Sequence, residues 1–218
     1  QILEAGKIAD DLSVCLASTV NQCGRESYRP AILEDIVDAI RKDQPKVVFA
    51  PHVETSNGVL LPPEFVASIA ETIHAYGGVF VLDCIASGAQ WVDMHTAGVD
   101  VLITAPQKGW SSTPCAAAIL LSEHADTLAS SLQSSSFSCD LNKWRAIMKE
   151  YEAGKYAYHA TMPTDGLIQF RDAIKETQNI GLESLRSAQL ELGQRINGIL
   201  GGAGFISIAA EGFQSASV

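Results

Sequence analysis

The sequence lacks the excess of positive charge that a nucleic-acid-binding protein needs. It has 15 Lys and Arg residues against 25 Asp and Glu residues, which gives a formal net charge of −10 at pH 7 and a pI near 4.9. A protein that neutralises a run of backbone phosphates presents a basic face, and this composition argues against one. It leaves room for a local basic pocket that binds one small anion. We therefore expect no nucleic-acid partner.

The sequence also lacks a long apolar run. No stretch reaches the roughly 18 apolar residues that are needed to cross a bilayer, and the N-terminal residues do not show a signal-peptide pattern. Hydrophobic residues nonetheless make up 47% of the 218 positions and charged residues 18%. This balance is typical of a packed core and not of a disordered chain. We expect one domain or a domain and a half, with no membrane partner.

Cysteines are few and widely spaced, and no C-x-x-C pair occurs. The five are Cys15, Cys23, Cys84, Cys115 and Cys139. An odd number without paired spacing indicates neither a disulfide framework nor a structural zinc site. Asp93 and His95 have no metal-like companions, so we expect no bound metal. A reducing compartment is the better expectation, and we predict a cytoplasmic protein.

The chain does contain a repeated alternation of strand and helix patterns. We expect strands around 13–17, 46–50, 79–83, 101–105 and 116–121, the last of them antiparallel at the sheet edge. We expect helices over 30–41, 62–76 and 141–153, followed by two helices within 164–200 that join near Gly181. Loops or connectors are expected at 21–29, 51–58, 84–99 and 130–138. The alternation predicts an α/β fold with a mostly parallel central sheet.

The long helical stretch near the end of the chain predicts a change of domain. We expect residues 1–178 to form a large domain and residues 179–218 to form a connector helix and the start of a small C-terminal domain. Gln1 is an unusual first residue, and the chain ends on Gln214-Ser215-Ala216-Ser217-Val218. We therefore expect a partial chain, with the large domain incomplete at its N-terminus and the small domain truncated.

Two of the expected strands end in side chains that carry chemistry. The run Val79–Asp83 ends in a carboxylate, and the run from Val101 is followed by Pro106-Gln107-Lys108-Gly109. Open α/β sheets bind ligands at the carboxyl ends of their strands. Alone, Lys108 is more often a solvated amine and Asp83 more often a turn residue. Together they place an amine and an acid on neighbouring strand ends.

This pair fits the chemistry of pyridoxal 5'-phosphate. A lysine amine forms a Schiff base with an aldehyde. A carboxylate beside the pyridine nitrogen favours its protonated form, because opposite charges attract. The protonated ring then serves as an electron sink for a substrate carbanion. Lys108 and Asp83 are the minimum protein contribution to that chemistry.

Several segments carry a resemblance to a known family. They are His52–Gly58, Val81–Gly88, Gly98–Val101, Thr104–Gly109 and Tyr158–Pro163. In order and spacing they resemble the class V aminotransferases of fold type I, nearest to the alanine–glyoxylate and serine–pyruvate aminotransferase group. The resemblance covers nearly the whole chain. It implies the large domain of that fold, with helices on both faces of the central sheet.

The resemblance also implies roles for single residues. Lys108 would form the Schiff base and move a proton between substrate and cofactor, and Asp83 would pair with the pyridine nitrogen. Thr55 would hydrogen-bond the ring oxygen of the cofactor. Ile85 would pack on the ring face if the chain stays extended after Asp83, and Gln107 would contact the phosphate.

Two further residues imply an assembly. In the family that the chain resembles, the positions of Tyr158 and Thr161 reach the phosphate in the neighbouring subunit. The resemblance therefore implies a homodimer with shared active sites. It implies transfer of an amino group from a small amino acid of the alanine or serine type. The acceptor would be a 2-oxo acid of the glyoxylate or pyruvate type.

Parts of such a site are expected outside these 218 residues. The phosphate-binding loop rich in glycine and serine, and the aromatic residue that stacks on the cofactor, should precede Gln1. The arginine that holds the substrate carboxylate should follow Val218. We therefore expect this segment alone to bind cofactor poorly. The family usually has a Pro-Pro-Gly-like turn after the lysine. Here Trp110 begins a bulkier one and could line the substrate entrance, which leaves donor and acceptor open.

Other functions are compatible with parts of the sequence. A cysteine desulfurase of the same fold usually has a histidine before the lysine, where this chain has Gln107, and its mobile cysteine could only be Cys139. A nicotinamide-dependent dehydrogenase needs G-x-G-x-x-G between a strand and a helix, whereas the glycines at 201–204 follow a helix. A catalytically silent homologue would not be expected to keep both Lys108 and Asp83.

The remaining polar residues have plainer interpretations. We expect Glu54 to bind a loop amide and His52 to be packed or hydrogen-bonded. Asp100 is expected to fix the turn that precedes its strand. Cys84 should point away from a cofactor at Asp83 and behave as a small buried hydrophobe. Trp91 is expected to serve packing.

Overall fold

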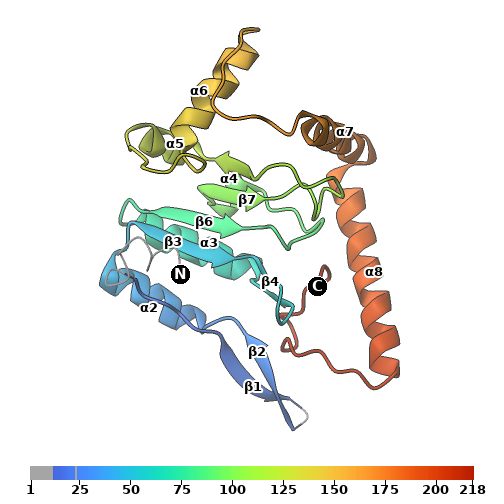
Figure 1. Ribbon diagram of the computed structural model, residues 1–218. Coiled ribbons are helices and arrows are strands. Elements are labelled where there is room, and N and C mark those ends of the chain that lie inside the picture. Colours follow the sequence, from blue (N-terminus) through green and yellow to red (C-terminus); the bar gives the residue numbers. More distant parts are fainter. Residues whose placement is uncertain (1–11, 23) are drawn as a thin grey trace.

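The computed structural model describes residues 12–22 and 24–218 and is built around a four-stranded sheet (Figure 1). The strands, in spatial order, are β3 (Val47–Pro51), β6 (Val79–Asp83), β7 (Val101–Thr104) and β8 (Ala118–Leu121). The first three are parallel, and β8 runs antiparallel to β7. The predicted α/β class, the mostly parallel sheet and the antiparallel edge strand are confirmed.

Seven helices of the described part of the chain accompany the sheet. They are α2 (Leu33–Asp43), α3 (Pro63–His74), α4 (Met94–Ala97), α5 (Glu123–Ser130), α6 (Leu141–Glu152), α7 (Thr164–Ile180) and α8 (Leu182–Gly202). The predicted helix at 141–153 and the two helices that join at Gly181 are confirmed. The predicted connector at 84–99 contains α4, a short helix whose N-cap, Asp93, accepts a hydrogen bond from the amide of Thr96.

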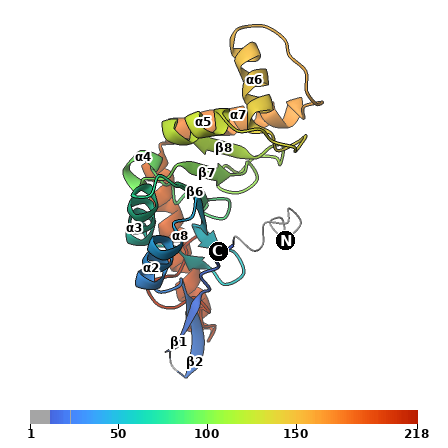
Figure 2. The ribbon, with the colours of Figure 1, turned by 90° about the vertical axis from the view of Figure 1, so that its left-hand side faces the viewer.

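Helices α2 and α3 cover one face of the sheet (Figure 2). Helix α3 begins at Pro63, since a proline at the first helical position loses no hydrogen bond. Its apolar face packs on Phe80 and Leu82 of β6, both fully buried. Each such side chain stabilises the fold by roughly 1.5–3 kcal/mol. This layer fixes the position and register of β6, the strand that ends in Asp83.

The opposite face of the sheet is more exposed. Val47 and Phe49 of β3 point to this side and are 54% and 59% exposed. The strand register places Pro51 level with Asp83, and Asp83 level with Ile103 of β7. Because paired residues of parallel strands share a face, Asp83 lies on the exposed side. We predicted helices on both faces of the sheet. Among the described residues, the helical layer that covers a face of the sheet is the one formed by α2 and α3.

The structure corrects the prediction for the first part of the chain. The strand expected at 13–17 is absent from that range, and the loop expected at 21–29 is instead an antiparallel hairpin of β1 (Ser18–Gln22) and β2 (Arg25–Arg29). These strands are polar and lack the apolar alternation that signals a strand. Tertiary pairing holds them, since the amide of Tyr28 donates to the carbonyl of Ile208 at 2.8 Å.

Two other boundaries differ from the prediction. Helix α2 begins at Leu33, three residues after Pro30. Pro30 lies outside the helix, and Ile32 is the N-cap. The loop expected at 51–58 contains the short strand β4 (Val53–Glu54), which pairs with β5 (Val59–Leu60). Both strands are too short to give a sequence period.

The C-terminal residues return to this hairpin. The carbonyl of Phe213 accepts a hydrogen bond from the amide of Leu60 at 2.7 Å, and the amide of Ser215 donates to the carbonyl of Gly58 at 2.8 Å. In Figure 1 the C-terminus lies beside β4, and α8 lies on the side of the sheet where β3 and β6 end. The domain boundary expected near residue 178 stays a prediction.

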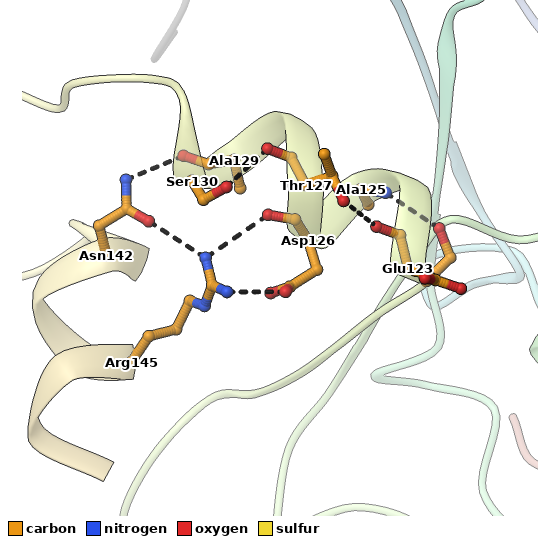
Figure 3. Close-up of polar contacts among 9 residues, drawn as sticks. Glu123, Ala125, Asp126, Thr127, Ala129, Ser130, Asn142 and Arg145 are labelled. Carbon is orange, nitrogen blue, oxygen red and sulfur yellow. Dashed lines mark hydrogen bonds and ion pairs between the residues drawn. The ribbon is translucent and has the colours of Figure 1, made fainter. Parts of the chain in front are cut away.

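A polar junction joins α5 to α6 (Figure 3). The guanidinium of Arg145 donates to the carboxylate of Asp126 at 2.7 Å and to its main-chain carbonyl at 3.4 Å. The side-chain amide of Asn142 donates to the carbonyls of Ala129 and Leu132 at 2.8 and 2.9 Å. These bonds satisfy the carbonyls at the end of α5 and orient α6, which leads to the segment with Tyr158.

Within the described residues, no helix combines the length and apolar character that a membrane span requires. In the same residues, no group of three or more His, Cys, Asp and Glu side chains is arranged to hold a metal ion.

Asp100 is a hub that ties the sheet to its helices. It is 4% exposed, and its carboxylate accepts hydrogen bonds from the amide of Phe80 at 2.9 Å, from His74 Nε2 at 2.7 Å and from the hydroxyl of Ser122 at 2.9 Å. Burial alone raises the pKa of this carboxyl, but these three hydrogen bonds lower the pKa below its ordinary value. These partners belong to β6, to α3 and to the N-cap of α5, so the expectation that Asp100 fixes the turn before β7 is wrong.

Replacing Asp100 with Ala should therefore destabilise the fold strongly. The change leaves the buried amide of Phe80 and the hydroxyl of Ser122 without their acceptor, and we expect a loss of about 3 kcal/mol in the free energy of unfolding. Urea denaturation measures it. Asp93→Ala, which removes the exposed cap of α4, is the control and should cost less. Equal losses in the two variants would contradict the role of Asp100.

Candidate active site

Asp83 is the last residue of β6 and is half-buried. Its carboxylate accepts a hydrogen bond from the amide of Ile85 at 2.9 Å. This is the local turn that aspartate favours, because its short side chain reaches the amide two residues ahead. The amide of Ser87 then donates to the carbonyl of Cys84 at 3.3 Å. The chain therefore turns directly after Asp83, and the extended path on which the packing role of Ile85 depended is not followed.

Lys108 lies in a turn that follows β7. The strand ends at Thr104, Pro106 is fully buried, and the amide of Lys108 donates to the carbonyl of Ala105 at 3.3 Å. The amide of Ser112 donates to the carbonyl of Pro106 at 2.9 Å and closes the turn. Lys108 and its neighbour Gln107 are exposed. The turn thus anchors its first residues in the core and presents the amine to the outside.

The turns that carry Asp83 and Lys108 touch each other. Strands β6 and β7 are parallel neighbours, so both turns leave the same edge of the sheet. A Cβ atom on Gly109 would lie 2.7 Å from the carbonyl carbon of Gly88, which no real side chain tolerates. Glycine at position 109 therefore lets the two backbones approach closely. The predicted placement of the amine and the acid on adjacent strand ends is confirmed.

Thr55 lies at the tip of the β4–β5 hairpin and is exposed. Glu54 accepts a hydrogen bond from the amide of Ser56 at 2.9 Å, which confirms its predicted structural role. The turn lines a shallow pocket of about 170 Å³, together with residues such as Asn197 and Gln214. Thr55 thus faces a polar pocket, and its contact with a cofactor stays a prediction.

Tyr158 and Thr161 are distant in sequence from the Asp83 and Lys108 turns and belong to a different segment of the fold. They belong to the segment between α6 and α7, and both are exposed. The hydroxyl groups of the two residues lie 3.3 Å apart, within hydrogen-bonding distance. The structure therefore brings the two together as a pair. Their contact with a neighbouring subunit stays a prediction.

His52 lies directly behind Asp83. It is 7% exposed, its amide donates to the main-chain carbonyl of Asp83 at 2.8 Å, and its Nδ1 is hydrogen-bonded to Ser87 Oγ at 2.7 Å. Burial and, secondarily, the positive charge of Arg186 lower the pKa of His52 to about 4. The expectation of a packed, hydrogen-bonded histidine is confirmed. The hydrogen bond between His52 and Ser87 is not visible in the sequence, although each of these two residues belongs to a segment that carries the resemblance.

Cys84 points into the core, away from the exposed face. It is 8% exposed and belongs to the apolar cluster beneath the sheet. Burial raises the pKa of its thiol to about 11, against a lowering by the Ser87 hydroxyl, and the charge of Asp83 raises it further. A thiol with this pKa is a poor nucleophile at neutral pH. The prediction of a small buried hydrophobe is confirmed.

Trp110 takes part in an aromatic cluster. Its ring centroid lies 4.9 Å from that of Trp91 and 5.9 Å from that of Phe170, and its Nε1 donates to the hydroxyl of Thr104 at 3.3 Å. Trp91 in turn donates to the carbonyl of Leu182, at the start of α8. Trp110 therefore joins the Lys108 turn to α7 and α8. A role at a substrate entrance stays a prediction.

The residues at the two strand ends fit the chemistry of pyridoxal phosphate. An exposed amine and a half-buried carboxylate leave the same sheet edge, and these are the groups that an aldehyde and a pyridine nitrogen require. In the Lys108 turn, the hydroxyl of Ser112 is buried and has no hydrogen-bond partner in the described part of the chain. The donor set is therefore compatible with this cofactor.

Comparison with known proteins gives a consistent result. The family model described as Aminotransferase class-V matches residues 14–216. Alanine–glyoxylate aminotransferase of Felis catus is 26% identical over 203 residues, covering 91% of this chain and 48% of the relative. Alanine–glyoxylate aminotransferase 1 of Saccharomyces cerevisiae is 28% identical over 194 residues, covering 83% and 49%. The chain spans about half the length of the curated relatives it matches.

The structural comparison agrees at the level of the fold. The crystal structure of an alanine–glyoxylate aminotransferase from Nostoc sp. superimposes with a TM-score of 0.73 at 20% identity, covering 85% of this chain and 48% of that one. At this identity the likeness establishes the fold alone.

The contact between the two turns gives a prediction for Gly109. In Gly109→Ala the new methyl group meets the backbone of Gly88, so the turns must separate. We expect a loss of roughly 1–3 kcal/mol in the free energy of unfolding, the usual cost of overpacking. Gly198→Ala in α8 meets open space and should instead stabilise by up to about 1 kcal/mol. Thermal unfolding compares the two; a neutral Gly109→Ala would show that the contact is loose.

The lowered pKa of His52 predicts a loss of stability in mild acid. Between its folded pKa of about 4 and the ordinary histidine pKa of 6.5, the unfolded chain binds more protons at this residue than the folded chain does. Stability from this group is therefore full above the higher value and falls as the pH drops towards the lower one. From pH 7 to about pH 5 we expect wild type to lose about 2 kcal/mol more than His52→Asn. Urea unfolding at both pH values measures the difference, and parallel curves for the two proteins would contradict it.

Proposed function

The chain belongs to the class V aminotransferase family. From this premise we propose that it is part of a pyridoxal-phosphate-dependent transaminase. The reaction moves an amino group from a small amino acid of the alanine or serine type to a 2-oxo acid of the glyoxylate or pyruvate type. One observation carries the proposal: Lys108 and Asp83 leave the same edge of the sheet on adjacent parallel strands, in turns that touch.

The substrate class is supported by the names of the relatives. Both curated proteins compared above are alanine–glyoxylate aminotransferases, at 26% and 28% identity. Since the chain spans about half of their length, activity and substrates of the whole protein are inferred from this part. Residues outside the chain also contribute to substrate choice in this proposal, above all a group that binds the substrate carboxylate.

Each candidate site residue named in this paragraph has a defined task in the proposed reaction. Pyridoxal phosphate, when bound, supplies the electron sink that stabilises negative charge on the substrate carbon. Lys108 Nζ would hold the cofactor aldehyde, and as a free amine it would carry the proton to and from that carbon. The carboxylate of Asp83 holds a proton on the ring nitrogen. Thr55 and Gln107 orient the ring oxygen and the phosphate.

The geometry of Asp83 suits its task. The amide of Ile85 occupies one carboxylate oxygen at 2.9 Å. That hydrogen bond restrains the side chain and leaves the other oxygen for a cationic partner. An acid that is already oriented loses little freedom when the partner binds, so its electrostatic effect is retained.

The proposed enzyme is a homodimer. Tyr158 and Thr161 are exposed and lie within hydrogen-bonding distance of each other, as a pair of hydroxyl donors for a phosphate would. In the proposal they serve the active site of the neighbouring subunit. A cytoplasmic location is proposed on the basis of the cysteine pattern alone.

The proposal predicts different consequences for the two central residues. Lys108→Ala should remove the covalent attachment of the cofactor and lower kcat by at least roughly 10³-fold, because proton transfer is lost with it. Asp83→Ala should keep the attachment site but weaken cofactor binding and lower kcat. The exposed Lys42→Ala is the control and should leave both unchanged. Absorbance of the bound cofactor and steady-state rates measure these effects, and an unaltered Lys108→Ala enzyme would refute the proposal.

Substrate identity requires a separate assay. We expect a screen of donors and acceptors on the full-length protein, with cofactor supplied, to find alanine or serine paired with glyoxylate or pyruvate. Release of sulfide from cysteine, without transfer to any 2-oxo acid, would replace the transaminase by a desulfurase.

A further inference from the structure

The segment Cys84–Gln90, named here the acid loop, connects the two halves of the proposed site. It follows Asp83 and makes two tight turns, in which Ser87 accepts and donates main-chain hydrogen bonds. Gly88 has a φ of +60°, a conformation that glycine adopts without strain, and its carbonyl group abuts Gly109. A displacement of the acid loop therefore shifts Asp83 at one end and the Lys108 turn at the other.

The acid loop is held from the C-terminal side by residues distant in sequence. The side chain of Gln189 in α8 accepts a hydrogen bond from the amide of Ala89. The hydroxyl of Ser217 donates to the carbonyl of Ala86 at 2.8 Å. These contacts restrain the outer side of the loop.

On the sheet side, the amide of Cys84 donates to the carbonyl of Ile103 at 2.8 Å, and His52 adds a second restraint. Its amide binds the carbonyl of Asp83 at 2.8 Å, and its ring binds the hydroxyl of Ser87 at 2.7 Å. It thus contacts Asp83, directly before the acid loop, and Ser87 in the middle of the loop. The imidazole is buried, so leaving Nδ1 without a partner would be unfavourable, and the Ser87 contact fixes the ring as well as the loop.

We propose that His52 is a positioning residue that acts through Ser87 to set the orientation of Asp83 and of the turn that carries Lys108. The inference rests on the proposed function of Asp83 and Lys108. His52 itself contacts the loop and no reacting atom. Its task is to keep the acid and the amine at the separation that one cofactor requires.

A packing role alone predicts a different pattern of effects. If His52 only fills space, any substitution of similar size should lower stability and leave cofactor attachment unchanged. If it positions the loop, the hydrogen bond to Ser87 matters more than the volume. Asn can offer a polar atom near the position of Nδ1, whereas Leu fills the space without one. Ser87→Ala removes one oxygen atom from the other side of the same bond.

The experiment compares attachment of pyridoxal phosphate at Lys108 in full-length variants. Each protein is incubated with the cofactor and reduced with borohydride, and the labelled fraction of the Lys108 peptide is measured by mass spectrometry. Cofactor dissociation constants and thermal unfolding are measured in parallel. His74→Leu is the matched control, because His74 forms an equally short bond of 2.7 Å, to Asp100, outside the proposed site.

We expect His52→Leu and Ser87→Ala to weaken cofactor binding by about tenfold or more and to lower labelling at Lys108. His52→Asn should stay closer to wild type. His74→Leu should unfold at a lower temperature but label like wild type. If His52→Leu does not fold, Ser87→Ala carries the same comparison.

Three results would overturn the inference, and they are distinguishable. Labelling of wild type at Lys108 together with wild-type labelling of Ser87→Ala and His52→Leu would refute the positioning role and leave the proposed function standing. An absence of label at Lys108 in wild type would refute the proposed function and the inference with it. Equal losses in His52→Asn and His52→Leu, with normal Ser87→Ala, would reduce His52 to packing.

Discussion

The close approach of two backbones at Gly88 and Gly109 is the constraint on which the candidate site depends. Parallel strands lie about 4.8 Å apart, so turns that leave neighbouring strands at the same edge compete for space. A Cβ atom at Gly109 would collide with the main chain of Gly88. Glycine at position 109 removes that conflict. Asp83 and Lys108 are therefore held by one continuous contact, not by two independent turns.

The sequence predicted the parts of this arrangement that arise from local pattern. Apolar runs that end at Asp83 and near Lys108 indicated adjacent parallel strands, because buried strands of this type are apolar on both faces. The β1–β2 hairpin was missed for the converse reason. Its strands are polar, and they are held by a turn and by main-chain hydrogen bonds to residues near Ile208. Polar strands carry no period that distinguishes them from a loop.

The hydrogen bonds that hold the candidate site in place could not be predicted from the sequence, because each of them joins residues that lie far apart in the chain. Gln189 is 100 residues from Ala89, and Ser217 is 131 residues from Ala86. Such contacts exist only after α8 has returned the C-terminal segment to the sheet. The hydrogen bond between His52 and Ser87 likewise needs β3 and β6 to be neighbours. Sequence pattern identifies the groups that perform chemistry more readily than the groups that hold them.

Burial also shapes the electrostatics around Asp83. Two titratable groups beside it are His52, with a pKa of about 4, and Cys84, with a pKa of about 11. Both are uncharged at neutral pH, since burial disfavours the imidazolium and the thiolate alike. A charged imidazolium behind Asp83 would offset the attraction of its carboxylate for a cation, and a thiolate would place a second negative charge beside it. Because neither charge forms, the negative charge of Asp83 acts towards the exposed face of the sheet, where a protonated ring nitrogen would lie.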